Sequence, residues 1–169
     1  QHGEEAGERL LIGPAAGASD ETYLVRFAHQ VTEMPVERLC ADGPDPLRLV
    51  AFGPSAQLEG AARGIADLAC GWQLLAVGNY GASELTVFAP GASKGTALEA
   101  LARHLGVSMS ETLAIGDGIN DVSLLQAAGL GVAMANGAEV VRQVARALAP
   151  SHADDGAAWA IRRYVLGSV

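Results

Sequence analysis

Short apolar segments alternate with amphipathic segments from residue 90 to the end of the chain, and this alternation limits the fold more than any other feature of the sequence. The apolar segments are only four or five residues long, as expected of strands that helices cover on both faces. The predicted strands are 112–115, 130–134 and 146–149, and the predicted helices are 93–105, 121–128, 138–145 and 157–166. This alternation predicts an α/β fold with a parallel sheet and crossover helices.

The first half of the chain has a less regular pattern that predicts a small, incomplete α+β domain. Strands are expected at 47–52, 72–77 and 84–89, with a turn at 78–81 and a further helical segment around 21–29. A helix capped by Ser55 is expected to stop near Gly71, and its apolar face carries Leu58, Ala62, Ile65 and Leu68. The sequence therefore divides into a partial α+β domain at 1–89 and an α/β domain at 90–169.

Composition excludes several classes of protein. Half of the 169 residues are apolar, 18% are charged and the mean hydropathy is +0.23, which indicates a packed globule and not a disordered chain. No apolar run approaches the length of a membrane span, and the start does not resemble a signal peptide, so we expect a cytoplasmic protein. The net charge of -8 is opposite in sign to that of nucleic-acid-binding proteins, so we expect neither nucleic acid nor membrane as a partner.

The segment 115–121, with the sequence I-G-D-G-I-N-D, follows a predicted strand at the place where parallel sheets bind ligands. Asp117 and Asp121, with Asn120 beside them, offer the hard oxygen atoms that Mg²⁺ prefers. Asp121, at the start of the next helix, either coordinates the metal or orients Asp117 and a metal-bound water. The spacing leaves an alternative open, in which Asp121 only caps the helix and Asp117 is a turn residue.

Lys94 is the only lysine of the chain and stands at the start of the helix predicted at 93–105. A positive charge at a helix N-terminus is unfavourable, and a bound phosphate would remove that disadvantage. The alternative is a solvated surface lysine. In this helix we expect Leu98, Leu101 and Leu105 to face inward and Gly106 to end the helix.

Two further polar positions have simpler interpretations. Asn136 follows a predicted strand, and we interpret it as a turn amide, with a supporting role behind the site as the alternative. Asp154 and Asp155 are expected to cap the last helix.

Taken together, these segments resemble the haloacid dehalogenase superfamily. The resemblance is carried by A-S-K-G-T-A-L at 92–98, A-I-G-D-G-I-N-D at 114–121, G-V-A-M-A-N at 131–136 and D-D-G at 154–156. More narrowly, the chain resembles the Cof-type branch, whose members carry a mobile α+β cap of class IIB ahead of the lysine motif. The likeness is specific over 85–169. Over 1–84 it is limited to the position of this segment ahead of the lysine motif and to its α+β pattern.

The resemblance implies Mg²⁺-dependent hydrolysis of phosphate monoesters through an aspartyl-phosphate, with a small phosphorylated metabolite such as a sugar or cofactor phosphate as substrate. It implies the C-terminal part of a Rossmann-like core, preceded by a partial cap. Lys94 matches the family's catalytic, phosphate-binding lysine, and Asn120 matches a phosphate-binding position. Asp117 and Asp121 match the metal-binding acidic residues, and Asp121 also matches a catalytic position.

The chain departs from the family pattern in one respect, because the superfamily's nucleophile belongs to a D-x-D motif. No D-x-D occurs among the aspartates, which are Asp20, Asp42, Asp45, Asp67, Asp117, Asp121, Asp154 and Asp155. The Ser or Thr of the second family motif also matches no residue of this chain. We therefore expect a C-terminal fragment of a longer phosphatase, inactive by itself.

Two other functions are compatible with these motifs. A regulatory or binding relative that lacks the nucleophile fits the chain as it stands. The phosphorylation domain of a P-type ATPase has a G-D-G-x-N-D motif and a similar following strand, but such a transporter also has membrane segments, and this sequence has none.

Overall fold

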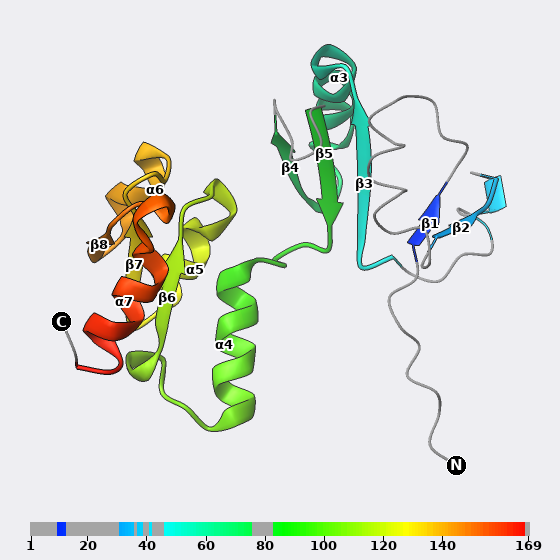
Figure 1. Cartoon of the computed structure of the whole chain (residues 1–169). Coiled ribbons are helices and arrows are strands. Elements are labelled where there is room, and N and C mark those ends of the chain that lie inside the picture. Colours follow the sequence, from blue (N-terminus) through cyan, green and yellow to red (C-terminus); the bar gives the residue numbers. More distant parts are fainter. Residues whose placement is uncertain are drawn as a thin grey trace. The chain divides into compact units, whose positions relative to one another are not determined.

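The computed structural model describes residues 10–12, 31–35, 37, 38, 41, 46–75 and 83–167. Its contacts divide the chain into two compact units, residues 1–90 and 91–169, which are treated separately below (Figure 1). The predicted helix at 21–29 and the predicted turn at 78–81 lie outside the described residues.

The unit at 91–169 is built on a three-stranded parallel sheet. Its strands are β6 (Leu113–Gly116), β7 (Leu130–Met134) and β8 (Ala147–Ala149), in the order β6-β7-β8. Ile115 lies opposite Val132, and Met134 lies opposite Ala149. All three strands were expected from the sequence to within a residue or two, and the predicted α/β fold with a parallel sheet is confirmed.

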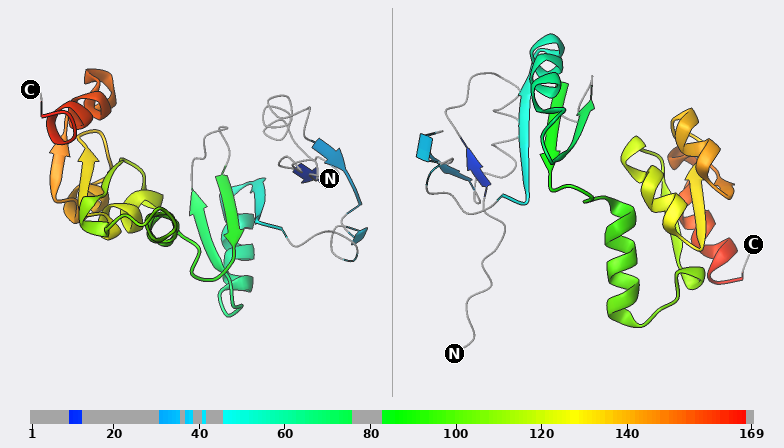
Figure 2. Two further views of the ribbon diagram at one scale, coloured as in Figure 1. Left: turned by 90° about the horizontal axis from the view of Figure 1, so that it is seen from below. Right: turned by 180° about the vertical axis from the view of Figure 1, so that it is seen from behind.

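Helices pack on both faces of this sheet. Successive strand residues point to opposite faces, so each face presents apolar side chains to the helices that cover it. The helices are α4 (Lys94–Leu105), α5 (Val122–Ala127), α6 (Glu139–Val144) and α7 (Gly156–Tyr164), with 3₁₀ turns η1 (Met109–Glu111), η2 (Ile119–Asp121) and η3 (His152–Asp154). Ala133 packs with Leu125 of α5 and Val141 of α6, whereas its neighbour Val132 packs with Ala160 of α7. Figure 2 shows α7 on the face of the sheet opposite α5.

The packing of α4 differs from the sequence expectation. Leu98 contacts the core, but Leu101 and Leu105 are 54% and 62% exposed, so their predicted inward orientation is wrong. The buried residues of α4 are Gly95 and Ala102, and α4 packs along α5, which has only six residues against the twelve of α4. Gly95, Leu98 and Ala102 form the packed face of the helix, and Leu101 and Leu105 lie to the side of it, in solvent.

The unit at 1–90 contains an antiparallel sheet with one helix packed on it. The strands β3 (Arg48–Gly53), β4 (Gly71–Leu75) and β5 (Ser83–Phe88) have the order β3-β5-β4, and a parallel pair is formed by β1 (Leu10–Ile12) and β2 (Val31–Glu33). The helix is α3 (Ser55–Ile65). Its residues Leu58 and Ala62 form a core with Leu85 of β5. The assignment of residues 1–89 to a cap domain stays a prediction.

Two details of α3 correct the sequence expectation. Ser55 is the first helical residue, and its hydroxyl donates to a carboxylate oxygen of Glu59, so it is not the capping residue. Leu68 is 61% exposed because α3 ends at Ile65, before the chain completes another turn along the apolar face. Within the described residues, none of the helices has the length and apolar character that crossing a membrane requires.

Candidate functional site

The candidate site is built on the loop that leaves the carboxyl end of β6. Gly116 ends the strand, and the chain then turns through Asp117 and Gly118 into η2, which leads directly into α5. A Cβ atom on Gly116 would lie 2.5 Å from the Cβ atom of Asp121, so only glycine leaves room for that side chain. The sequence G-D-G therefore lets Asp121 fold back beneath the turn that carries Asp117.

Asp121 is buried, and both of its carboxylate oxygens accept hydrogen bonds. Oδ2 accepts from the backbone N–H groups of Asp117 at 3.1 Å and of Gly118 at 3.0 Å, and Oδ1 accepts from Nζ of Lys94 at 2.5 Å. The carboxylate makes no capping hydrogen bond to α5. Asp121 thus occupies the N-cap position of α5 without bonding to that helix, and its carboxylate instead accepts the N–H of Gly118 at the start of η2. It is more than a helix cap, because its other oxygen accepts from Lys94.

Lys94 reaches this carboxylate from the first turn of α4. The turn is fixed by a capping box, in which Ser93 and Thr96 bond to each other's backbone N–H groups. The next residue, Gly95, is buried and donates its N–H to Oγ of Ser123 at 3.3 Å. A Cβ atom on Gly95 would lie 2.5 Å from the backbone oxygen of Ser123, so the small residue sets how closely α4 approaches α5.

The surroundings of Asp121 favour its charged form. Burial by itself would raise the pKa of this carboxyl, but the hydrogen bond from Lys94 and those from the backbone of Gly118 and Asp117 outweigh burial and hold the pKa below its usual value. The carboxylate thus stays ionised and keeps Lys94, whose side chain is 49% exposed, directed at the loop. Lys94 is therefore not the freely solvated lysine of the alternative interpretation.

Asp117 and Asn120 lie at the surface of the same loop. Oδ2 of Asp117 accepts from Nδ2 of Asn136 at 2.9 Å, while Oδ1 accepts no hydrogen bond from any described residue. The side-chain oxygen of Asn120 lies over Gly118, where an added Cβ atom would come within 2.5 Å of it. The structure thus brings Lys94, Asp117, Asn120 and Asp121 to one edge of the sheet.

The donor set suits Mg²⁺ in part. Among the described residues, no three His, Cys, Asp or Glu side chains gather closely enough to hold a metal ion. Magnesium is commonly held by one or two protein carboxylates, with waters and substrate phosphate oxygens as the other ligands. Asp117 fits such a role because one of its exposed carboxylate oxygens is open. Asp121 fits an orienting role better, since hydrogen bonds occupy both of its oxygens.

Asn136 does more than the turn amide that the sequence predicts. It lies in the loop after β7, donates to Asp117, and accepts the backbone N–H of His152 on its Oδ1 at 2.9 Å. The signal for this role in the sequence was its place after a strand of the same parallel sheet. The expected side-chain capping by Asp154 and Asp155 is not observed. Asp155 precedes α7 at the N-cap position without a side-chain capping bond, and Asp154 accepts from Ser151.

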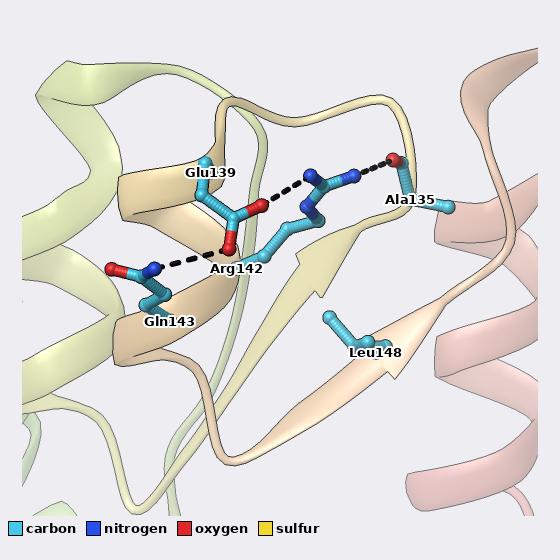
Figure 3. Close-up of a pocket in the computed structure, with 5 residues that line it drawn as sticks. All are labelled: Ala135, Glu139, Arg142, Gln143 and Leu148. Carbon is cyan, nitrogen blue, oxygen red and sulfur yellow. Dashed lines mark hydrogen bonds and ion pairs between the residues drawn. The ribbon is translucent and has the colours of Figure 1, made fainter.

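A shallow pocket near β8 is lined by Ala135, Glu139, Arg142, Gln143 and Leu148 (Figure 3). The Arg142 guanidinium donates to the carboxylate of Glu139 and to the backbone oxygen of Ala135. The hydrogen bonds from Arg142 and Gln143 hold the pKa of Glu139 below its usual value. Because the charge of Arg142 is already paired with Glu139, this pocket is a poor phosphate site. The bond from Arg142 to Ala135 instead fixes the loop next to Asn136.

Comparisons with known proteins agree with the motifs at this site. The chain is 51% identical over 80 residues to the chloroplastic endoribonuclease YBEY of Arabidopsis thaliana, a match that covers 47% of this chain and 14% of that protein. It is 37% identical over 92 residues to the 5-amino-6-(5-phospho-D-ribitylamino)uracil phosphatase YcsE of Bacillus subtilis, covering 54% of this chain and 37% of the phosphatase.

The solved structure of the subclass IIB sugar phosphatase BT4131 superimposes with a TM-score of 0.71 and 21% sequence identity. The match covers 93% of this chain and 57% of the phosphatase chain, so the two share a fold. The chain spans less than two thirds of the length of each of these three proteins.

The family assignment rests on a longer match. Residues 41–161, which include the lysine, the acidic loop and Asn136, match the sequence profile of the haloacid dehalogenase-like hydrolases. The resemblance to this superfamily and its Cof-type branch is thereby confirmed. This chain belongs to the haloacid dehalogenase-like hydrolase family.

Proposed function

We propose that this chain supplies the lysine and acidic part of the active site of a Mg²⁺-dependent phosphatase that acts on small phosphorylated metabolites. The observation that carries the proposal is the ion pair of Lys94 with buried Asp121, beside Asp117 at the carboxyl end of β6. Membership of a hydrolase family and the named phosphatase among its relatives support it. A cytoplasmic location stays a prediction from the sequence.

Phosphate binding is assigned to Lys94 and Asn120. The ammonium group of Lys94 has three N–H donors, of which one meets Asp121, so two remain for the oxygens of a phosphate group. Asn120 adds an exposed side-chain amide on the loop above the buried carboxylate. Phosphoryl transfer needs mainly such positioning groups and cations around the transferred oxygens.

Metal binding is assigned to Asp117, with Asp121 holding the loop in place. Bound Mg²⁺ would neutralise charge on the phosphoryl oxygens during the reaction. Asp121 fixes the backbone of Asp117 and Gly118 by accepting both of their N–H groups, so the ligand is held by main-chain bonds as well as by its own side chain. Oδ1 of Asp121 accepts only the bond from Lys94, so direct coordination by this oxygen would place the cation next to the ammonium group.

The family resemblance implies the order of bond changes. The phosphoryl group passes from the ester oxygen of the substrate to an aspartate, the alcohol leaves with a proton, and water then hydrolyses the aspartyl-phosphate. Because no D-x-D occurs among residues 1–169, the proposed activity requires a nucleophile from outside this sequence. The same absence favours the second candidate function, a regulatory relative that binds phosphorylated ligands without turnover.

The test is turnover by the protein encoded by the complete coding sequence that contains this chain. Release of phosphate from sugar, nucleotide and cofactor monophosphates should require Mg²⁺. Lys94→Ala should lower kcat by about 10²–10³-fold, because it removes a charged donor aimed at the transferred group. Asp117→Ala should abolish turnover at every Mg²⁺ concentration, because it removes the proposed metal ligand.

Arg103→Ala is the matched control for Lys94→Ala, since it also removes one positive charge from α4, at the far end of the helix. It should retain wild-type turnover. Absence of turnover from a whole protein that contains D-x-D, together with retained binding of phosphate esters, would favour the regulatory relative.

A further inference from the structure

Asn136 connects three loops of the unit at 91–169. It stands two residues beyond the end of β7, and its side chain reaches Asp117 in the loop after β6 and His152 in the loop after β8. These loops are far apart in the sequence and meet because the three parallel strands end at the same edge of the sheet. A single amide side chain thus links the candidate metal ligand to the segment that precedes α7.

Both ends of this amide have defined partners. Nδ2 donates to Oδ2 of Asp117 at 2.9 Å, and Oδ1 accepts the backbone N–H of His152, also at 2.9 Å. Rotating the amide by half a turn would set its oxygen against the carboxylate and its NH₂ group against an N–H donor, and both contacts would be repulsive. The backbone of His152 therefore determines which atom of Asn136 faces Asp117.

The main chain of the same loop also contacts Asp117. The N–H of Ala138 donates to the backbone oxygen of Asp117 at 3.3 Å, and a Cβ atom on Gly137 would lie 3.2 Å from the Cα atom of Asp117. On the other side, Arg142 donates to the backbone oxygen of Ala135 at 3.1 Å. Asn136 is therefore a side chain held on a braced loop and not a free surface amide.

We propose that Asn136 is a positioning residue that orients the carboxylate of Asp117 for a divalent cation. By donating to Oδ2, it leaves Oδ1 as the oxygen with no partner among the described residues, so the carboxylate offers one oxygen in a fixed direction. Groups that hydrogen-bond to a metal ligand tune metal affinity in this way. The inference rests on the proposed role of Asp117 as metal ligand.

The test is a titration of the isotope-labelled 169-residue chain with Mg²⁺, followed by ¹H–¹⁵N NMR at the amides of Asp117 and Gly118. Asn136→Ala should weaken Mg²⁺ binding by about tenfold or more, as is typical when a hydrogen-bond partner of a metal ligand is removed. His152→Pro should also weaken Mg²⁺ binding, because proline removes the N–H that Asn136 accepts, together with the imidazole, at the first position of η3, where proline is tolerated.

Two readouts separate positioning from general loosening of the loop. Ser151→Ala removes the hydrogen bond to Asp154 in the same segment without touching Asn136 or Asp117, and it should leave the Mg²⁺ affinity at the wild-type value. Titration with inorganic phosphate in the absence of Mg²⁺, followed at the amide of Lys94, should be the same for wild type and Asn136→Ala.

Wild-type Mg²⁺ affinity in Asn136→Ala would overturn the inference, and so would a wild-type chain whose Asp117 and Gly118 amides do not respond to Mg²⁺. An equal loss of phosphate and Mg²⁺ binding in Asn136→Ala would assign the residue a purely structural role. The titration needs no substrate, so failure of the proposed phosphatase activity in the whole protein would leave this result standing.

Discussion

At the scale of single residues, Asp121 is the best-defined group of the site. Its two oxygens accept three hydrogen bonds, from one ammonium and two backbone N–H groups, and the side chain is almost completely buried. A buried carboxylate with its hydrogen-bonding capacity used in this way stabilises the folded chain and holds its partners. Asp121 therefore links the stability of the loop to the position of Lys94.

Asp121→Asn should lower the free energy of unfolding at pH 7 by about 1–3 kcal/mol, since an amide cannot accept all three of these bonds. The pKa of Asp121 is held below its usual value, so its stabilisation is complete above the unfolded pKa of about 4 and is lost as the pH falls through the lower folded pKa. Urea unfolding should therefore show the difference between variant and wild type at neutral pH and a smaller difference in acid.

The control for this substitution is Asp67→Asn, which changes an exposed carboxylate of the other unit. We expect it to change the free energy of unfolding by less than about 0.5 kcal/mol at either pH. A loss in Asp121→Asn that stays constant from neutral pH into acid would contradict the assigned ionisation.

At the scale of elements, the contact between α4 and α5 decides where Lys94 lies. Gly95 is the point of closest approach, because an added Cβ atom would meet the backbone oxygen of Ser123 at 2.5 Å and backbone cannot move aside as a flexible side chain can. Gly95→Ala should therefore cost about 1–3 kcal/mol of folding free energy, although alanine favours helices more than glycine does.

Gly64→Ala provides the matched comparison. Gly64 lies in α3 with no atom within 4 Å of an added Cβ atom, so this substitution should stabilise the chain by about 0.5–1 kcal/mol. Thermal unfolding of the two variants should then shift in opposite directions. The same direction of shift for both would show that helix preference, and not the contact with Ser123, controls position 95.

The burial of leucines in the helices allows a second comparison. Leu125 of α5 is 1% exposed and packs against the sheet, whereas Leu101 of α4 is largely exposed. Leu125→Ala should cost about 2–5 kcal/mol because it leaves a cavity in the core. Leu101→Ala should cost less than about 1 kcal/mol, and a larger cost measured by denaturant unfolding would restore the inward orientation expected from the sequence.

At the scale of the whole molecule, the described residues supply few ligands for a cation. Of the two aspartates at the site, Asp117 is the one with a carboxylate oxygen that accepts no hydrogen bond from a described residue. No group of three metal-binding side chains occurs in the part of the chain that the structure describes. Mg²⁺ should therefore bind this chain weakly, and at a concentration equal to Kd it would stabilise the fold by only RT ln 2, about 0.4 kcal/mol.

Millimolar Mg²⁺ should thus raise the free energy of unfolding of the 169-residue chain by less than about 1 kcal/mol, and Asp117→Asn should remove that increment. Calorimetry with and without the metal measures both values. Stabilisation of about 3 kcal/mol or more that persists in Asp117→Asn would place the cation elsewhere on the chain.

The sequence by itself determined the α/β fold of residues 90–169, the three parallel strands and the family. These are properties of local pattern, since the alternation of apolar residues and the G-D-G-I-N-D loop are contained within single elements. The existence of α4 and its end at Gly106 also followed from the sequence, because Gly106 has the left-handed φ of 69° that glycine adopts readily.

Only the tertiary structure decided which side chains meet. Lys94 and Asp121 are 27 positions apart, and the contact of Asn136 with Asp117 spans 19, so each pair depends on strand order and on how closely the helices pack. The same dependence explains the exposed Leu101 and Leu105, whose periodicity is helical but which lie beside the face of α4, carried by Gly95, Leu98 and Ala102, that is packed. Periodicity records which residues share a face of an element, whereas burial and pairing depend on the element that packs against that face.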